Sequence, residues 1–154
     1  MPHAAAIERL AAQFRDIPPV APMRIRIASY DGDTLCLSAP LASHVNDKGS
    51  AFGGSLVSMM TLASWGQVML QIEQAGLAAD VFVAHSEVRY REPLLADLEV
   101  ESRLSDDCSW DTFLSTLAAR GRAHATLLAS VALPDGGIAC DCRSRYVAIA
   151  KRQP

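Results

Sequence analysis

The longest uninterrupted pattern of apolar and polar positions in this chain runs from Gly49 to Ile72, and no charged side chain interrupts it. Hydroxyl and amide side chains recur at steps of three and four, at Ser55, Ser58, Thr61, Ser64, Gln67, Gln71 and Gln74. This spacing predicts one helix of about six turns over residues 54–75. So many polar groups on one stripe argue against a membrane span, so we expect a helix buried inside a soluble protein.

Six shorter runs with β character flank this helix. They lie at Met23–Ser29, Thr34–Ala39, Val81–Arg91, Leu95–Leu104, Arg122–Leu133 and Ile138–Ile149. The turn residues Asp31 and Gly32 separate the first two runs, and Pro134 to Gly137 separate the last two. Both pairs are therefore predicted to form hairpins.

Two further helices are predicted. Residues 4–15 carry apolar side chains at helical spacing, and Ser109 is a suitable N-cap for a helix that ends before Gly121. The order is helix, hairpin, long helix, two strands, short helix and hairpin. This order predicts an α+β architecture in which an antiparallel sheet of six strands covers one central helix. We expect residues 1–154 to form a single domain.

Composition and charge narrow the possible partners. Half of the residues are apolar, the net charge is −3, and no block of Lys or Arg occurs, which argues against nucleic-acid binding. The first residues lack a basic region followed by an apolar run, so we expect a cytoplasmic protein. Four cysteines lack Cys-x-x-Cys spacing and are expected to be reduced core thiols: Cys36, Cys108, Cys140 and Cys142.

The loop before the central helix holds the candidate chemistry, and residues 46–55 read N-D-K-G-S-A-F-G-G-S. Gly53 and Gly54 fall where the first N–H groups of a helix point outward, and glycine lets a carbonyl oxygen or an anion approach them closely. The side-chain amide of Asn46 could donate to an oxyanion, or Asn46 could be a turn residue that bonds its own loop.

The histidines give weaker signals. His44 and Asp47 are too few to suggest a metal site, and none is expected. A lone histidine such as His85 is more often structural or exposed than catalytic. Alternation along a strand puts Ser86 and His85 on opposite faces. The inward-facing set is predicted to be Phe82, Ala84, Ser86, Val88 and Tyr90.

The loop motif, followed after the helix by Tyr90, Arg91 and Pro93, resembles the hot-dog acyl-thioesterases. The resemblance is closest to the YiiD carboxy-terminal-domain family, which is described as putative thioesterases, and it covers nearly the whole chain. It implies the hot-dog fold and a homodimer or a dimer of dimers, with sites at subunit boundaries that an acyl chain on a pantetheine arm enters. It also implies that the N–H of Gly54 points at the thioester carbonyl, with Asn46 beside it.

We therefore expect Asn46, Gly54 and Thr61 to be catalytic. Thr61 stands two turns past the glycines, where many thioesterases of this shape carry an Asp or Glu. The residues expected to bind substrate are Phe52, Gly53, Ser58, Ser86 and Arg91. Arg89, Arg91 and Lys48 are candidates for holding the phosphates of coenzyme A or the acidic surface of a carrier protein, although solvated surface charge is the alternative. No separate cofactor is expected, because coenzyme A or phosphopantetheine enters as part of the substrate.

Three functions remain open from the sequence. A thioesterase would use Gly54 and Asn46 as oxyanion donors, with water activated by Asp47, His85 or a network of hydroxyls. A malonyl-thioester decarboxylase would need oxyanion donors but no strong base, which suits Thr61. A non-catalytic acyl-binding protein would need neither.

Overall fold

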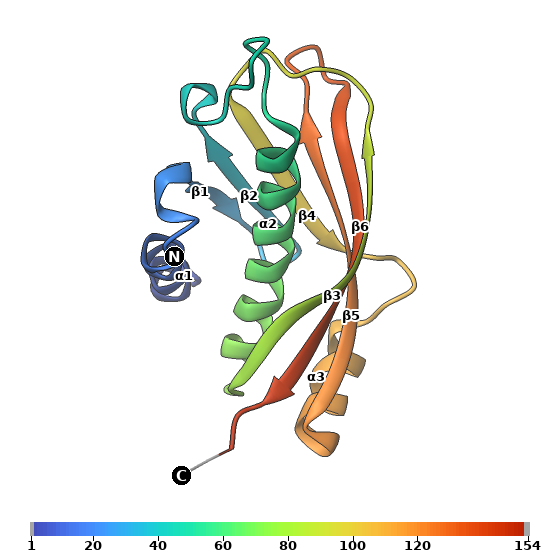
Figure 1. Ribbon diagram of the computed structural model, residues 1–154. Coiled ribbons are helices and arrows are strands. Elements are labelled where there is room, and N and C mark those ends of the chain that lie inside the picture. The colour runs from blue at the N-terminus through green and yellow to red at the C-terminus, as the bar shows by residue number, and fades with distance from the viewer. Residues whose placement is uncertain (1, 153–154) are drawn as a thin grey trace.

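Three α-helices and six strands make up residues 2–152, the part of the chain that this computed structural model describes (Figure 1). The helices are α1 (Ala4–Asp16), α2 (Gly53–Gln74) and α3 (Trp110–Arg120). The strands are β1 (Arg26–Tyr30), β2 (Thr34–Ala39), β3 (Ala79–Tyr90), β4 (Leu98–Leu104), β5 (Arg122–Ala132) and β6 (Ile138–Ala150). Two short 3-10 helices precede β1 and follow β2: η1 (Ala21–Met23) and η2 (Leu41–Ser43).

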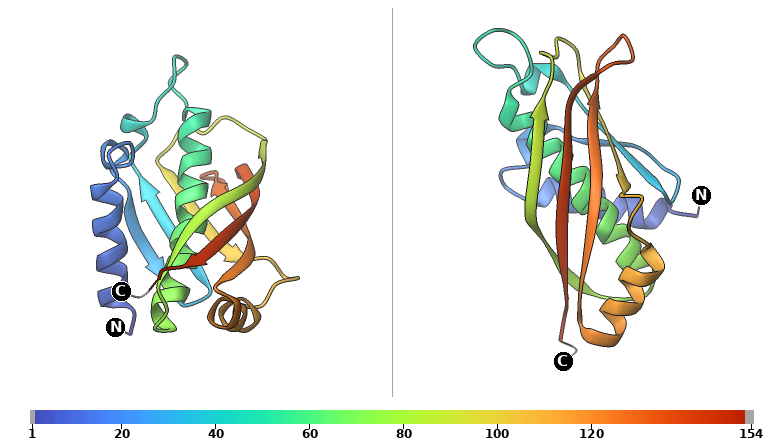
Figure 2. Two further views of the ribbon diagram at one scale, coloured as in Figure 1. Left: turned by 60° about the horizontal axis from the view of Figure 1, so that its bottom comes forward. Right: turned by 90° about the vertical axis from the view of Figure 1, so that its right-hand side faces the viewer.

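The six strands form one antiparallel sheet in the order β1-β2-β4-β5-β6-β3. The sheet curves around α2, which crosses its inner face, as the two views of Figure 2 show. α1 packs beside α2 near β1, and α3 packs mainly on β5 and touches α2 (Figure 1). This is the predicted α+β hot-dog arrangement. Because β3 pairs only with β6, its other edge is free within the described chain.

α2 is buried as its uncharged sequence predicts. Met59, Met60 and Ala63 are at most 1 % exposed and lie in one core cluster with side chains from the sheet. Gly66 allows α1 to approach, because a Cβ at that position would lie 3.0 Å from Cδ2 of Leu10. Within residues 2–152, no helix is long and apolar enough to cross a membrane.

Local signals set the element ends. Ser109 caps α3 by accepting a hydrogen bond from the N–H of Thr112 at 3.3 Å, and Gly121 ends the helix with φ of 71°, both as predicted. The first strand begins at Arg26 instead of Met23, because Met23 belongs to η1 and Arg24 takes a left-handed conformation with φ of 56°. β4 begins at Leu98 instead of Leu95.

A β-bulge in β3 corrects the predicted inward set. The register shifts between Val83 and His85, so Val83 pairs with buried Tyr146, and Phe82 pairs with Val147. Phe82 therefore faces the outer side of the sheet, where the plain alternation would place it inward. Beyond the bulge the prediction holds, since the pairing partners of Ser86, Val88 and Tyr90 are buried. These partners are Ser144, Cys142 and Cys140.

Candidate functional site

The start of α2 presents two unpaired hydrogen-bond donors. The N–H groups of Ser55 and Leu56 both donate to the carbonyl of Phe52, at 3.0 and 3.1 Å. The N–H groups of Gly53 and Gly54 have no acceptor within residues 2–152, and no side chain caps the helix. Two free donors at the positive end of a 22-residue helix form a place where negative charge is stabilised.

Two exposed aromatic rings border these glycines. A Cβ on Gly54 would lie 2.5 Å from Cε2 of Phe52, and one on Gly53 would lie 3.3 Å from Cε1 of Tyr90. The phenol of Tyr90 also donates to the carbonyl of Gly53 at 3.1 Å. Partial burial, with smaller contributions from the Cys140 and Cys142 thiols, raises the pKa of Tyr90, so the phenol keeps its proton as a donor. A side chain at either position would therefore have to displace the neighbouring ring.

Asn46 organises its own loop. Its Oδ1 accepts hydrogen bonds from the N–H groups of Lys48 and Ser50, at 2.8 and 3.1 Å, and its Nδ2 donates to Oγ of Ser50 at 2.9 Å. This is the turn role that the sequence left as the alternative. An amide nitrogen carries two hydrogens, so one donor of Asn46 remains uncommitted.

Thr61 lies on α2 beside the buried phenol of Tyr146. Tyr146, which is 0 % exposed, donates its phenol hydrogen to the carbonyl of Thr61 at 3.2 Å. Burial raises the pKa of Tyr146 to about 12, so this donor stays neutral. The side-chain hydroxyl of Ser58 has no hydrogen-bond partner within residues 2–152, whereas that of Thr61 lies close enough to the phenol of Tyr146 to lower its pKa slightly against the larger effect of burial. Both positions are half-buried, and the hydroxyl of Ser58 is uncommitted.

Ser86 faces the helix side of the sheet, and its hydroxyl lies 2.8 Å from that of Ser144. Ser64 and Ser102 form a similar buried pair at 2.9 Å. His85 points to the opposite face, where it pairs in register with exposed Arg145. The sequence prediction that Ser86, and not His85, faces inward is thus confirmed.

Two of the three charged candidates, Arg91 and Lys48, are already paired, whereas Arg89 forms no ion pair within residues 2–152. Arg91 forms a hydrogen-bonded ion pair with Asp141 through its Nε, which is the larger cause of a raised pKa for its guanidinium. Lys48 pairs with Asp47 at 2.9 Å, and both side chains are more than 75 % exposed. Exposed ion pairs of this kind are weak, so both cations remain available to an anionic ligand at low cost.

One buried histidine next to the helix start was missed by sequence reasoning, which considered His44 only as a metal ligand. His44 is 3 % exposed. Its Nε2 lies 2.8 Å from the carbonyl oxygen of Met23, and its Nδ1 lies 2.8 Å from Oγ of Ser55. A carbonyl only accepts, so Nε2 carries a proton, and in the neutral imidazole Nδ1 then accepts the hydroxyl hydrogen of Ser55. The two residues are eleven positions apart in the sequence, and no spacing rule would have joined them.

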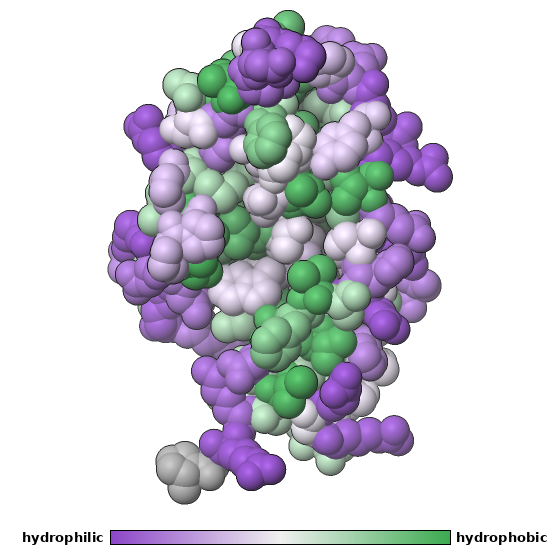
Figure 3. Space-filling view, in the orientation of Figure 1, coloured by the Kyte–Doolittle hydropathy of each residue, from purple (hydrophilic) through white to green (hydrophobic). Residues whose placement is uncertain are grey.

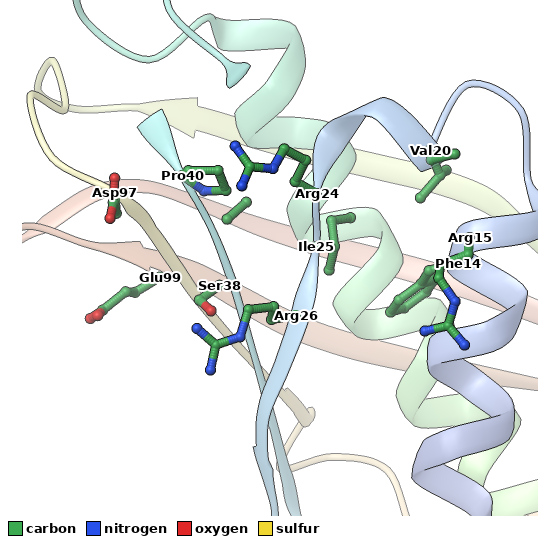
Figure 4. Close-up of a pocket in the computed structure, with 12 residues that line it drawn as sticks. Phe14, Arg15, Val20, Arg24, Ile25, Arg26, Ser38, Pro40, Asp97 and Glu99 are labelled. Carbon is green, nitrogen blue, oxygen red and sulfur yellow. The ribbon is translucent and has the colours of Figure 1, made fainter. Parts of the chain in front are cut away.

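A hollow of about 590 Å³ lies elsewhere, between the end of α1, η1, the start of β1 and the end of β2 (Figure 4). Arg24 and Arg26 line it together with Asp97 and Glu99, so the charges on its walls are mixed. It does not include any predicted site residue.

Comparisons with known proteins identify the family and the fold. The family model described as "Putative thioesterase (yiiD_Cterm)" matches residues 7–150. A protein of unknown function from Chlorobaculum tepidum TLS has a similar structure, with 28 % identity, a TM-score of 0.87 and 94 % of each chain covered. The putative thioesterase from Shewanella oneidensis shares 28 % identity with a TM-score of 0.84, over 95 % of this chain and 99 % of that one. A probable thioesterase from Pseudomonas aeruginosa, at 20 % identity and a TM-score of 0.79, shares the fold over 98 % of this chain and 97 % of its own.

Proposed function

The chain belongs to the YiiD carboxy-terminal-domain family of putative thioesterases, and we propose from this that it hydrolyses acyl thioesters carried by coenzyme A or by an acyl carrier protein. The observation that carries the proposal is the pair of unpaired N–H groups of Gly53 and Gly54 at the first turn of α2. Hydrolysis of a thioester passes through a tetrahedral intermediate with a negatively charged oxygen. Donors that are already fixed in place stabilise such an oxygen without reorganisation.

In this mechanism the thioester carbonyl points at the N–H of Gly54. The uncommitted hydrogen of Asn46 is the second donor, and the dipole of α2 adds to both. The loss of one such donor typically lowers the rate by about a hundred- to a thousandfold. Phe52 and Tyr90 flank the glycines, so their rings would contact the reacting group or the pantetheine arm.

A second candidate, decarboxylation of a malonyl thioester, is favoured by the residue at position 61. A threonine stands there, which carries a neutral hydroxyl and no base, and the hydroxyl of Ser58 one turn earlier has no partner within the described chain. In decarboxylation, loss of CO₂ moves charge onto the thioester oxygen, so neutral donors suffice and no base is needed. Thr61, Asn46 and Gly54 would then act as the donor set.

We also propose that the working form is a homodimer, alone or paired into a dimer of dimers. β3 is twelve residues long, and one of its edges is free within the part of the chain that the structure describes. Phe52, Phe82, Val83 and Tyr90 are each between 47 and 57 % exposed, and Figure 3 shows apolar surface along this side of the molecule. A second copy would pair the edge and cover these side chains. The four free thiols suit a reducing compartment, and we place the protein in the cytoplasm.

The products formed from acetyl and malonyl thioesters test the proposal. Hydrolysis releases a free thiol from either substrate, whereas decarboxylation converts the malonyl thioester to an acetyl thioester and CO₂. Binding of an acyl carrier with no product from any thioester would support an acyl-binding protein and contradict both enzymatic proposals.

A further inference from the structure

Ser55 and His44 form a hydroxyl–imidazole pair at the first turn of α2. We propose that Ser55 is a nucleophile and that His44 is its general base, so that thioester cleavage proceeds through an acyl-serine intermediate. This inference rests on the proposed thioester hydrolysis and names the groups that carry it out.

The hydrogen bonds have the direction that this role requires. Nε2 of His44 donates to the carbonyl of Met23 at 2.8 Å, which leaves the lone pair of Nδ1 directed at the Ser55 hydroxyl, also at 2.8 Å. A nucleophile, a base within hydrogen-bond reach and a third group that orients the base are the common signature of covalent catalysis. The Met23 carbonyl takes the orienting position here, and it would also stabilise the protonated imidazole.

The pair also lies where the reaction needs it. Ser55 follows Gly54 directly, so its hydroxyl and the unpaired N–H groups belong to the same turn of helix. Ser55 is half-buried and so reachable, while His44 behind it is 3 % exposed. The loop is anchored at this point, because the N–H of Phe52 donates to the carbonyl of His44 at 2.7 Å.

The other bases considered for this site are badly placed. Thr61 has no carboxylate, Asp47 is an exposed ion-pair partner of Lys48, and His85 points to the outer face of the sheet. Among these groups, only the imidazole of His44 has a free lone pair directed at an oxygen on α2. General-base assistance of this kind typically contributes about a hundred- to ten-thousandfold in rate.

The steps balance as follows. Oγ of Ser55 forms a bond to the thioester carbon while its proton passes to Nδ1 of His44, and the carbonyl oxygen becomes an oxyanion held by the helix N–H groups. The carbon–sulfur bond then breaks, and the departing sulfur takes the proton from His44. Water next attacks the acyl-serine, giving one proton to His44. The bond to Oγ breaks, Oγ regains that proton, and the acyl group leaves as a carboxylic acid.

Labelling with a fluorophosphonate reagent tests the nucleophile without any assumption about the substrate. We expect the wild-type protein to be labelled at Ser55, as located by peptide mass spectrometry. His44→Gln keeps an N–H for the Met23 carbonyl but offers no base, so its labelling should fall at least tenfold in protein shown to be folded by its melting temperature. Absence of label on Ser55 in the folded wild type would overturn the proposal.

Ser55→Ala tests the role in turnover. Alanine suits a helix, and we expect kcat for a thioester that the wild type hydrolyses to fall at least a hundredfold. The control is Ser43→Ala, which removes an exposed hydroxyl without a hydrogen-bond partner in the described chain, from the residue next to His44, and should leave kcat unchanged. A quenched wild-type reaction should contain protein heavier by the acyl group, whereas Ser55→Ala should not.

Different results would overturn the acyl-serine proposal and the proposed thioester hydrolysis. Wild-type kcat in Ser55→Ala would overturn the acyl-serine route and leave thioester hydrolysis standing. Absence of turnover by the wild type on every thioester would overturn the hydrolase proposal, while the labelling result would still decide whether Ser55 is an activated nucleophile.

Discussion

The ring of Phe52 lies so close to Gly54 that a Cβ on Gly54 would come within 2.5 Å of ring carbon Cε2. The glycine is thus needed for a reason internal to the fold, beside any need to admit a substrate. The atom that would collide is the far end of an exposed side chain, and this end can move. The two needs can therefore be separated by mutation.

We expect Gly54→Val to lower turnover at least a hundredfold with a modest loss of stability, because its branched side chain fills the space in front of the free N–H groups. Thioester turnover and thermal melting measure the two effects. Gly54→Ala in a Phe52→Ala background is the matched test of crowding. If the ring alone requires the glycine, this double variant regains the activity of Phe52→Ala. Normal turnover by folded Gly54→Val would remove the helix start from the mechanism.

Asn46→Asp and Thr61→Val test whether neutral side-chain donors stabilise the negative charge that develops on the substrate. Asp retains an oxygen for the N–H groups of Lys48 and Ser50 but loses the Nδ2 donor, and Val keeps the shape of Thr without its hydroxyl. Each substitution should lower kcat about a hundredfold and change KM far less. Steady-state kinetics on short acyl and malonyl thioesters provide the measurement.

Asp47→Asn is the control for these variants. It removes an exposed, ion-paired carboxylate next to Asn46 in the sequence and should leave kcat close to wild type. If Asn46→Asp and Thr61→Val both keep wild-type rates on every substrate, the donor set named here is wrong.

Thr61→Asp restores the carboxylate that many thioesterases of this shape carry. We expect it to raise hydrolysis and to lower decarboxylation of a malonyl thioester, because a negative charge at this position activates water but opposes charge that develops on the substrate. Chromatography of the products separates free thiol from acetyl thioester. Unchanged product ratios would show that position 61 does not face the reacting group.

The free edge of β3 predicts an obligate oligomer. Light scattering at micromolar concentration should give a mass of at least two chains. Phe82→Lys places a charge on the free edge strand, and we expect it to favour the monomer and to lower turnover with it. A monodisperse wild-type monomer that is fully active would contradict the homodimer.

Stability should fall at alkaline pH. Burial is the main cause that raises the pKa of Cys140 to about 11 and of Tyr146 to about 12, so folding favours their neutral, protonated forms. Their contribution is complete below the unfolded pKa values, roughly 9 and 10, and is lost as the pH rises through the folded values. Urea unfolding between about pH 8 and 12 should show the free energy of unfolding falling, by roughly 3 kcal/mol from Tyr146 at most.

Tyr146→Phe separates this contribution from the rest. At neutral pH the substitution should cost about 1–3 kcal/mol, because the carbonyl of Thr61 loses its buried donor. Above about pH 10 the free energy of unfolding should fall less steeply in this variant than in the wild type. Parallel curves for the two proteins would mean that Tyr146 does not titrate as its burial indicates.

Patterns within a single element made most of the fold predictable. The uncharged stripe of α2 and the caps Ser109 and Gly121 depend on neighbours close in sequence, and their ends agree with the structure within about one residue. The bulge at Ala84 was not predictable in this way. It is an extra residue in one strand relative to its partner β6, so it becomes visible only when both strands are paired.

The candidate site also combines features set by neighbours close in sequence with contacts between distant segments. The glycines of α2 could be identified because a polar loop and a long uncharged helix meet at them. The contacts of His44 with Met23 and Ser55, and of Tyr90 with Gly53, join segments that are eleven to thirty-seven residues apart. Such contacts depend on how the loop closes over the sheet, and no local pattern in the sequence encodes that closure.

The pairing order of the sheet has a consequence for biosynthesis. Within residues 2–152, β3 has one neighbour, β6, and residues 91–137 must be translated before the first residue of β6 appears. A ribosome that pauses in this interval leaves β3 with both edges open, because β6 has not yet been made. We therefore expect synonymous codon changes within this interval to affect the yield of native protein without altering a single residue.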